Sequence, residues 1–189
     1  MHKIVFIAGM TGAGKSVVAD ELVKNGFAFV RFGQITLDKV KEQGLEPIEE
    51  NERRIREGIR KEHGQAAFAL LNIPKFDELL KNSNVVGDGL YSWLEYKVLK
   101  EKYKDSMYVV AVYAPPEMRY QRLENRAVEN DEKQRFRSFT RKEAKARDYA
   151  EIENSEKGGP IAMADFTIIN TGTIEDLKQK TREILLKIK

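Results

Sequence analysis

The sequence contains no cysteine, no long hydrophobic run and no strong excess of charge of either sign. Without cysteine, the chain can form neither a disulfide framework nor a thiolate metal site. No apolar run approaches the ~20 residues that span a bilayer, and the run near the start is too short for a signal peptide. The formal net charge of +3 gives no reason to expect general attraction to nucleic acid or membranes. We therefore expect a soluble cytoplasmic protein.

What the sequence does contain is an alternation of short apolar runs with longer, charged segments of helical period. The apolar runs are rich in Val, Ile, Phe and Tyr, which is typical of strands buried on both faces. The alternation predicts an α/β fold, a three-layer sandwich with a parallel sheet of about five strands between helices. The expected strands are 3–8, 27–32, 85–87, 107–114 and 166–169. The expected helices include 16–25, 93–103, 116–126 and 174–188, the last capped by Thr173 and Asp176.

Two segments interrupt this alternation. Residues 33–83 contain no expected strand and are interpreted as several helices. Residues 127–160 form a second charged, helical stretch that ends at the turn signal KGGP. Neither has enough apolar residues for its own core, so residues 1–189 are expected to form one domain with two insertions at the edge of the sheet.

The most specific motif is GMTGAGKS, which follows the first expected strand and precedes the first expected helix. It matches the phosphate-loop pattern G-x-x-x-x-G-K-[ST], in which backbone N–H groups and the helix dipole hold phosphate. Lys15 is expected to bridge the β- and γ-phosphates, and Ser16 to bind Mg²⁺. The alternative is a glycine-rich turn that only caps a helix. The expected nucleotide contacts are Gly9, Thr11, Gly12, Ala13, Gly14, Lys15, Ser16 and Val17.

Asp88 is the second candidate, because it ends a buried strand within VVGDGLYSWLE. A carboxylate there can hold a water of the Mg²⁺ shell through an outer-sphere contact. The alternative is a turn-forming Asp-Gly pair.

Arginine is concentrated between residues 119 and 147. Phosphoryl transfer spreads negative charge over the oxygens of the transferred group, and arginines on a flap that excludes water stabilise that charge. Acidic residues are also frequent there, so the alternative is a solvated helix face of mixed charge. The arginines are Arg119, Arg122, Arg126, Arg135, Arg137, Arg141 and Arg147.

Together these motifs resemble those of the nucleoside monophosphate kinase group of P-loop proteins. AGMTGAGKS resembles the group's phosphate loop, GDGLYS resembles a strand end in adenylate kinases, and RYQRLENR resembles the opening of their lid. The resemblance implies that Arg122 stacks on adenine and Arg126 binds phosphate. It also implies that 33–83 binds the acceptor, that 127–160 is the lid, and that the phosphate-loop strand lies near the middle of the sheet.

The sequence is also similar to adenylate-kinase-related proteins found mainly in archaea. There IRKEHGQAAFA resembles a helix that implies Arg60 as an acceptor ligand, and FTRKEAKA matches a lid segment containing Arg141. MADFTIINTGTIEDL matches the closing strand and helix of that group and resembles dephospho-CoA kinase, in which the loop after the last strand lies against adenine. In this sequence that loop is Asn170, Thr171 and Gly172.

Two departures from these families bear on the acceptor. Residues 90–92 (Leu-Tyr-Ser) follow the Asp-Gly pair where the related kinases have an arginine, so Arg54, Arg60 or Lys61 is expected to supply the missing phosphate ligand. The second strand ends in RFGQITLDK, without the acidic residue by which dephospho-CoA kinases accept a hydroxyl proton. A phosphate acceptor is already anionic and needs no base, so a nucleoside monophosphate is favoured.

The sequence thus predicts an ATP-dependent kinase that transfers the γ-phosphoryl group, with Mg²⁺, to a small acceptor such as a (deoxy)nucleoside monophosphate. The expected catalytic residues are Lys15, Asp88, Arg126 and Arg141, and the metal ligands are Ser16 and, through water, Asp88. Two alternatives stay open. One is dephospho-CoA kinase or another small-molecule hydroxyl kinase. The other is an RNA-associated ATPase or switch, which the near-neutral charge disfavours.

Overall fold

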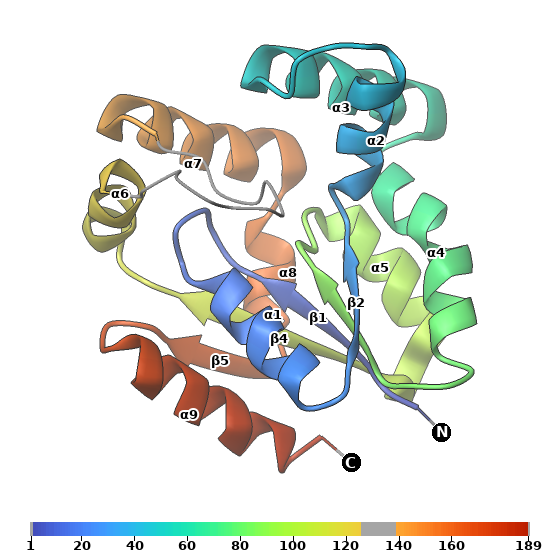
Figure 1. Cartoon of the computed structure of the whole chain (residues 1–189), viewed down its shortest axis with the longest axis vertical. Helices are drawn as coiled ribbons and strands as arrows, with labels where there is room; N and C mark the ends of the chain where they lie inside the picture. The colour runs from blue at the N-terminus through green and yellow to red at the C-terminus, as the bar shows by residue number, and fades with distance from the viewer. Residues whose placement is uncertain (1, 126–138, 189) are drawn as a thin grey trace.

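The computed structural model describes residues 2–125 and 139–188 of the chain. Five strands form one sheet in the order β2-β3-β1-β4-β5, and every neighbouring pair is parallel. The predicted α/β fold with a five-stranded parallel sheet is confirmed, and the strand that leads into the phosphate loop is central (Figure 1). The strands are β1 (Ile4–Ala8), β2 (Ala28–Arg31), β3 (Val85–Asp88), β4 (Met107–Tyr113) and β5 (Phe166–Ile169).

Helices cover both faces of the sheet and complete the three layers (Figure 1). Helices α1 (Lys15–Lys24) and α9 (Ile174–Leu185) pack on one face, and α4 (Ala67–Leu79), α5 (Trp93–Tyr103) and α8 (Gly158–Ala162) pack on the other. The remaining helices are α2 (Gln34–Glu42), α3 (Glu49–His63), α6 (Pro116–Glu124) and α7 (Arg141–Ser155), with a short 3₁₀ turn, η1 (Lys104–Ser106). No helix in the described ranges is both long and apolar enough to pass through a bilayer.

The central strand β1 is buried on both faces because its side chains alternate between two hydrophobic clusters. Val5 and Ile7 pack toward α1 and α9, whereas Phe6 packs toward α4 and α5. The ring of Phe6 lies 5.3 Å from that of Phe76, centroid to centroid. A Cβ at Gly87 would come within 2.5 Å of the Phe6 ring, so glycine on the neighbouring strand makes room for it. This packing explains the continuous apolar run of the strand.

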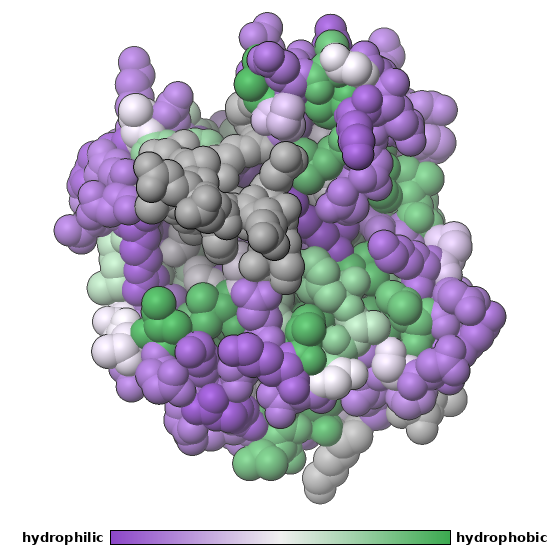
Figure 2. Space-filling view, in the orientation of Figure 1, coloured by the Kyte–Doolittle hydropathy of each residue, from purple (hydrophilic) through white to green (hydrophobic). Residues whose placement is uncertain are grey.

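The segment 33–83 contains no strand, as predicted, but its helices occupy two different places. Helix α4 packs on the sheet and buries Phe76 in the main core. Only α2 and α3 extend beyond the carboxyl ends of the strands, where α7 also lies (Figure 1). Helix α3 turns Ile55 and Ile59 inward, and hydrophilic side chains predominate on the outer surface at this end (Figure 2).

The start of α9 agrees with the sequence prediction, whereas the start of α8 lies where the sequence predicted a turn. Thr173 and Asp176 form the predicted capping box at the start of α9, with hydrogen bonds of 3.1 and 2.8 Å. The predicted turn at KGGP instead opens the short helix α8. Pro160 lies in the first turn of that helix, where a backbone N–H has no helical partner to lose.

Candidate active site

The phosphate loop joins β1 to α1 at the carboxyl edge of the sheet, and its shape requires glycine. Gly9 and Gly14 have φ angles of +141° and +107°, which side chains with a Cβ rarely adopt. A Cβ at Gly9 would lie 2.4 Å from the Val112 carbonyl oxygen, and one at Gly14 would lie 2.4 Å from Asn170 Nδ2. The loop therefore exposes main-chain N–H groups at the start of α1 in a form that suits a bound phosphate group.

Lys15 folds back over this loop and donates a 3.1 Å hydrogen bond to the carbonyl of Met10. Loss of hydration, followed by the nearby ammonium of Lys157, lowers the pKa of Lys15 to about 7, although Asp88 and Glu151 oppose the shift. The ammonium form of Lys15 is thus destabilised, and a bound anion would favour it.

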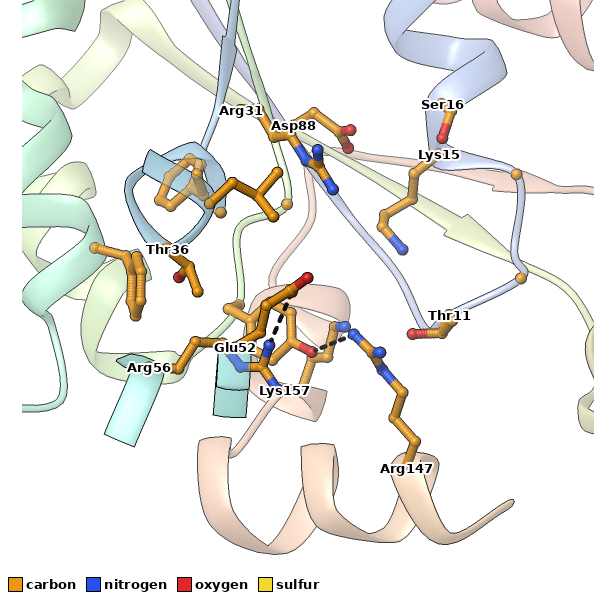
Figure 3. Close-up of a pocket in the computed structure, with 18 of the residues that line it drawn as sticks. Thr11, Lys15, Ser16, Arg31, Thr36, Glu52, Arg56, Asp88, Arg147 and Lys157 are labelled. Atoms are coloured by element: carbon orange, nitrogen blue, oxygen red, sulfur yellow. Dashed lines mark hydrogen bonds and ion pairs between the residues drawn. The ribbon is translucent and has the colours of Figure 1, made fainter. Parts of the chain in front are cut away.

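A cavity of about 290 Å³ extends from the phosphate loop to α2 and α3 and to the α7 side of the molecule (Figure 3). Basic side chains outnumber acidic ones along its wall, which suits an anionic ligand. The basic residues are Lys15, Arg31, Arg56, Arg60, Arg147 and Lys157, and the acidic residues are Asp20, Glu52 and Asp88.

Asp88 lines this cavity from the end of β3, and Ser16 lines it from the start of α1. The sheet register places Asp88 opposite Arg31 on β2 and Ile7 on β1. No group of three or more metal-ligating side chains occurs in residues 2–125 and 139–188. A Mg²⁺ ion held by Ser16 and Asp88 would therefore take its remaining oxygen ligands from phosphate and water, as Mg²⁺ commonly does. The donor set fits that ion.

Glu151 on α7 connects the far wall of the cavity to the phosphate loop. Its carboxylate accepts hydrogen bonds from Lys157 Nζ at 2.6 Å, Arg147 Nε at 2.9 Å, Thr11 Oγ1 at 3.1 Å and the Tyr91 hydroxyl. Burial alone would raise the pKa of Glu151, but the Lys157 and Arg147 cations hold it well below its usual range. The carboxylate stays charged and fixes both cations at the cavity wall.

Helix α3 contributes charged side chains to the cavity, and the helix face on which each residue lies decides which of them line it. Glu52, Arg56 and Arg60 follow one another at intervals of four residues and line the cavity. Arg54 and Lys61 lie on other faces of the helix, exposed to solvent, so the structure does not bring these two predicted ligands to the cavity. Arg56 pairs with Glu52 at 3.4 Å (Figure 3).

Asn170, in the loop after β5, supports the phosphate loop from outside the cavity. The side-chain amide of Asn170 donates a 2.8 Å hydrogen bond to the Ala13 carbonyl, and the main-chain carbonyl of Asn170 accepts one of 3.0 Å from Arg122. Burial lowers the pKa of Arg122, whose Nη1 atom is buried without a hydrogen-bond partner in the described part of the chain. Thr171 and Gly172 are exposed.

The other arginines of the cluster have different positions. Arg141 lies outside the cavity, exposed, and pairs with Glu117 on α6, so its expected catalytic position is not observed in this structure. Arg119 is buried against Asp148, as a structural ion pair. Arg126, Arg135 and Arg137 lie outside the described residues. Arg147 is the member of the described cluster that reaches the cavity.

Comparison with known proteins identifies the family. Residues 5–163 match the family model described as an AAA domain. A UPF0200 protein of Thermococcus gammatolerans is 35% identical over 187 residues, covering 98% of this chain and 95% of the relative. UPF0200 protein TK1334 of Thermococcus kodakarensis is 34% identical, with 98% and 97% covered. The chain belongs to the UPF0200 family.

Solved structures show that this UPF0200 protein has a P-loop kinase-like fold, which confirms the resemblance seen in the sequence. TT1252 from Thermus thermophilus has a TM-score of 0.63 at 19% identity, covering 100% of both chains. Shikimate kinase from Acinetobacter baumannii, in complex with shikimate, has a TM-score of 0.56 at 22% identity, with 100% and 96% covered. A gluconokinase from Sinorhizobium meliloti has a TM-score of 0.58 at 13% identity, with 99% and 93% covered. At these identities the likeness concerns the fold alone.

Several cavity residues of the UPF0200 chain were absent from the sequence prediction of the site, among them the charged residues Arg31, Glu52, Arg56 and Lys157. Glu52 and Arg56 could have been found from the sequence, because they lie on α3 beside the apolar face that the spacing of Ile55 and Ile59 marks. No local sequence pattern indicates Lys157, since the Tyr91 ring that it contacts belongs to a distant part of the sequence.

Proposed function

We propose that this protein is an ATP-dependent phosphotransferase that moves the γ-phosphoryl group to a small phosphate-bearing acceptor, in the first place a (deoxy)nucleoside monophosphate. The observation that carries the proposal is the cavity that joins the phosphate loop to the basic residues of α3. A donor phosphate at the phosphate loop and an anionic acceptor at α3 would share this one cavity, as direct transfer requires.

On this proposal the chain supplies positioning and charge. The phosphate loop and Lys15 hold the triphosphate, and Ser16 with Asp88, through water, would hold Mg²⁺, which neutralises phosphate charge when bound. Arg122 and the loop of Asn170, Thr171 and Gly172 are proposed to lie beside the adenine. Arg126 is proposed to bind phosphate, as the family resemblance implies.

The acceptor is proposed to bind between α2 and α3. Arg56 and Arg60 would bind its phosphate, and Thr36, 1% exposed, lines the same space with a hydroxyl that has no hydrogen-bond partner in the described chain. An oxygen of the acceptor phosphate would form the new bond to the γ-phosphorus. The bond to the bridging oxygen would break, and its electron pair would stay on ADP. An anionic nucleophile needs no base.

A second candidate is a kinase for a small hydroxyl acceptor, and Glu52 favours it. This carboxylate is 5% exposed and lines the acceptor side of the cavity. A carboxylate in that position could accept the proton of an attacking hydroxyl group.

The test is ADP production from Mg-ATP with a panel of ribo- and deoxyribonucleoside monophosphates, dephospho-CoA and small polyols. Under the first proposal, a nucleoside monophosphate supports turnover, Lys15→Ala abolishes it, and Glu52→Gln retains it. Turnover on a hydroxyl acceptor that is lost in Glu52→Gln would support the second candidate instead. ATP hydrolysis indifferent to every acceptor would contradict both.

Two matched variants on α3 test the acceptor side. Arg60→Ala should raise the KM for the acceptor about tenfold or more, since a charge-assisted hydrogen bond contributes roughly 1.5–3 kcal/mol. Arg54→Ala removes an exposed arginine of the same helix and should leave that KM unchanged. Equal effects of the two substitutions would place the acceptor elsewhere.

A further inference from the structure

Lys157 is enclosed at the cavity wall, in the turn between α7 and α8. Only 1% of the residue is exposed, although lysine is rarely buried without a partner. Its ammonium lies 2.6 Å from Glu151 Oε2 and 4.0 Å from the centroid of the Tyr91 ring. A carboxylate and an aromatic face therefore hold this cation in one place.

The surroundings of Lys157 keep that place fixed. Two residues further on, Gly159 lies against the indole of Trp93, and a Cβ on this glycine would come within 2.8 Å of the ring. Glu151 is itself bound to the phosphate loop through Thr11, at 3.1 Å. The chain just after Lys157 thus packs against α5, and the Lys157 ammonium is linked to the phosphate loop through Glu151.

Lys157 shares the cavity with Lys15, which approaches from the phosphate loop. In Figure 3 the side chain of Lys15 extends toward the space in which Arg147 and Lys157 end. Among the charged neighbours of Lys15, Lys157 lowers its pKa most. Two ammonium groups that face one cavity repel each other, and an anion between them removes the repulsion.

Tyr91, whose ring lies against the Lys157 ammonium, also bears on the role of Lys157. Tyr91 follows Asp88-Gly89 in the stretch where the related kinases have an arginine. Its ring lies under Lys157, and its hydroxyl binds Glu151. A cation is therefore present near this position, but it comes from a distant part of the chain.

We propose that Lys157 is a catalytic residue that contacts the phosphoryl group in flight, opposite Lys15, and that Glu151 is the positioning residue that holds it there. The inference rests on the proposed phosphotransferase function. The bond between the γ-phosphorus and the bridging oxygen breaks with its electron pair left on ADP, and an acceptor oxygen forms the new bond. The ammonium group of Lys157 would stabilise the charge on the equatorial oxygens.

The decisive experiment compares wild type with Lys157→Met for binding of Mg-ADP and of Mg-ADP with aluminium fluoride, a planar mimic of the transferred phosphoryl group. This probe needs no acceptor. Calorimetry gives the affinities, and Trp93, the one tryptophan of the chain, reports the binding by fluorescence. Lys157→Met should bind Mg-ADP within about twofold of wild type and lose on the order of 10²-fold or more of the extra affinity that aluminium fluoride confers. Lys157→Arg, which keeps the charge, should recover part of it.

Each outcome decides the inference. If Lys157→Met retains the full gain from aluminium fluoride, or wild type shows no gain, Lys157 does not contact the phosphoryl group and the inference is wrong. If the gain depends on Lys157 but no nucleoside monophosphate is turned over, the inference stands and the proposed acceptor fails. A wild-type protein that binds no Mg-ADP would overturn both. Thermal unfolding of Lys157→Met and of Lys157→Met/Glu151→Gln shows whether any loss reflects folding.

Discussion

The side-chain amide of Asn170 donates a 2.8 Å hydrogen bond to the main-chain carbonyl of Ala13, across 157 positions of sequence. Both residues are buried, at 7% and 0% exposure. The same amide fills the space beside Gly14 that a Cβ would need. The loop after the last strand therefore sets the shape of the phosphate loop, and the nucleotide site depends on both ends of the chain.

Replacement of Asn170 by alanine should weaken this support. The buried carbonyl of Ala13 would lose its partner, which costs about 1–3 kcal/mol, and the affinity for Mg-ATP should fall with the distortion of the loop. Urea unfolding and calorimetry would measure the two effects. Thr171→Ala, at the exposed neighbouring residue, should change stability by no more than about 0.5 kcal/mol. Equal effects of the two substitutions would show that the amide contact is dispensable.

Loss of the buried Arg119–Asp148 pair should destabilise the fold. Both side chains are less than a tenth exposed, and two hydrogen bonds of 2.9 and 2.5 Å join them. Asp148→Ala would leave the guanidinium buried without its counter-ion, at a cost of about 3–5 kcal/mol. Arg53→Ala, which breaks an ion pair about two-thirds exposed on both sides, should cost at most about 1 kcal/mol. The free energies of unfolding in urea would test the contrast, and similar values for both variants would contradict it.

Binding of Mg-ATP should take up a proton at Lys15. In the free protein the pKa of Lys15 is about 7, and bound phosphate favours the charged form, which raises that pKa. The affinity should therefore be nearly constant below pH 7 and decrease as the pH rises above it. Calorimetry at pH 8 in buffers of different ionisation enthalpy should show uptake approaching about one proton. Lys15→Arg, which stays charged, should show less, and an absence of buffer dependence in wild type would refute the prediction.

Glu95 should make the protein less stable as the pH rises from about 4.5 to about 7. Burial raises the pKa of its carboxyl from 4.5 to about 7, although hydrogen bonds from the N–H groups of Ser92 and Tyr91 and the nearby Arg60 and Lys157 cations oppose the shift. Between those values the unfolded chain loses the proton first, so the contribution of Glu95 to the free energy of unfolding falls with rising pH.

Glu95→Gln tests this dependence, because the amide oxygen can accept the same backbone N–H groups without becoming charged. The variant should be more stable than wild type at pH 8 by about 1–3 kcal/mol, and the difference should shrink toward pH 5. Glu153→Gln, at an exposed glutamate, should follow wild type across this range in urea unfolding. A constant difference between Glu95→Gln and wild type would show that Glu95 does not titrate there.

The parts of the fold that the sequence predicted are those with local causes. The phosphate loop is a contiguous motif, the strands are short apolar runs, and the Thr173–Asp176 capping box lies within four residues. Arg54 and Lys61 were chosen for charge alone. The spacing of the buried Ile55 and Ile59 on α3 already indicated the face that carries Glu52, Arg56 and Arg60.

The α7 side of the site could not be predicted in this way. Glu151 meets Thr11 across 140 positions and Tyr91 across 60, and no local pattern encodes either contact. The similarity of FTRKEAKA to a lid segment led to Arg141, which pairs with Glu117 outside the cavity. The residues that reach the cavity, Arg147 and Lys157, are selected by how α7 and α8 pack on the rest of the molecule.

The position of β1 in the sheet has a consequence for synthesis of the chain. Its five residues, IVFIA, are completely buried in the folded protein, yet its two neighbours begin only at Val85 and Met107. A ribosome makes the central strand first and its partners much later, so the most apolar run near the N-terminus waits unpaired in the nascent chain. Contacts of such large separation also slow folding, and fragments that stop before residue 85 should aggregate through β1.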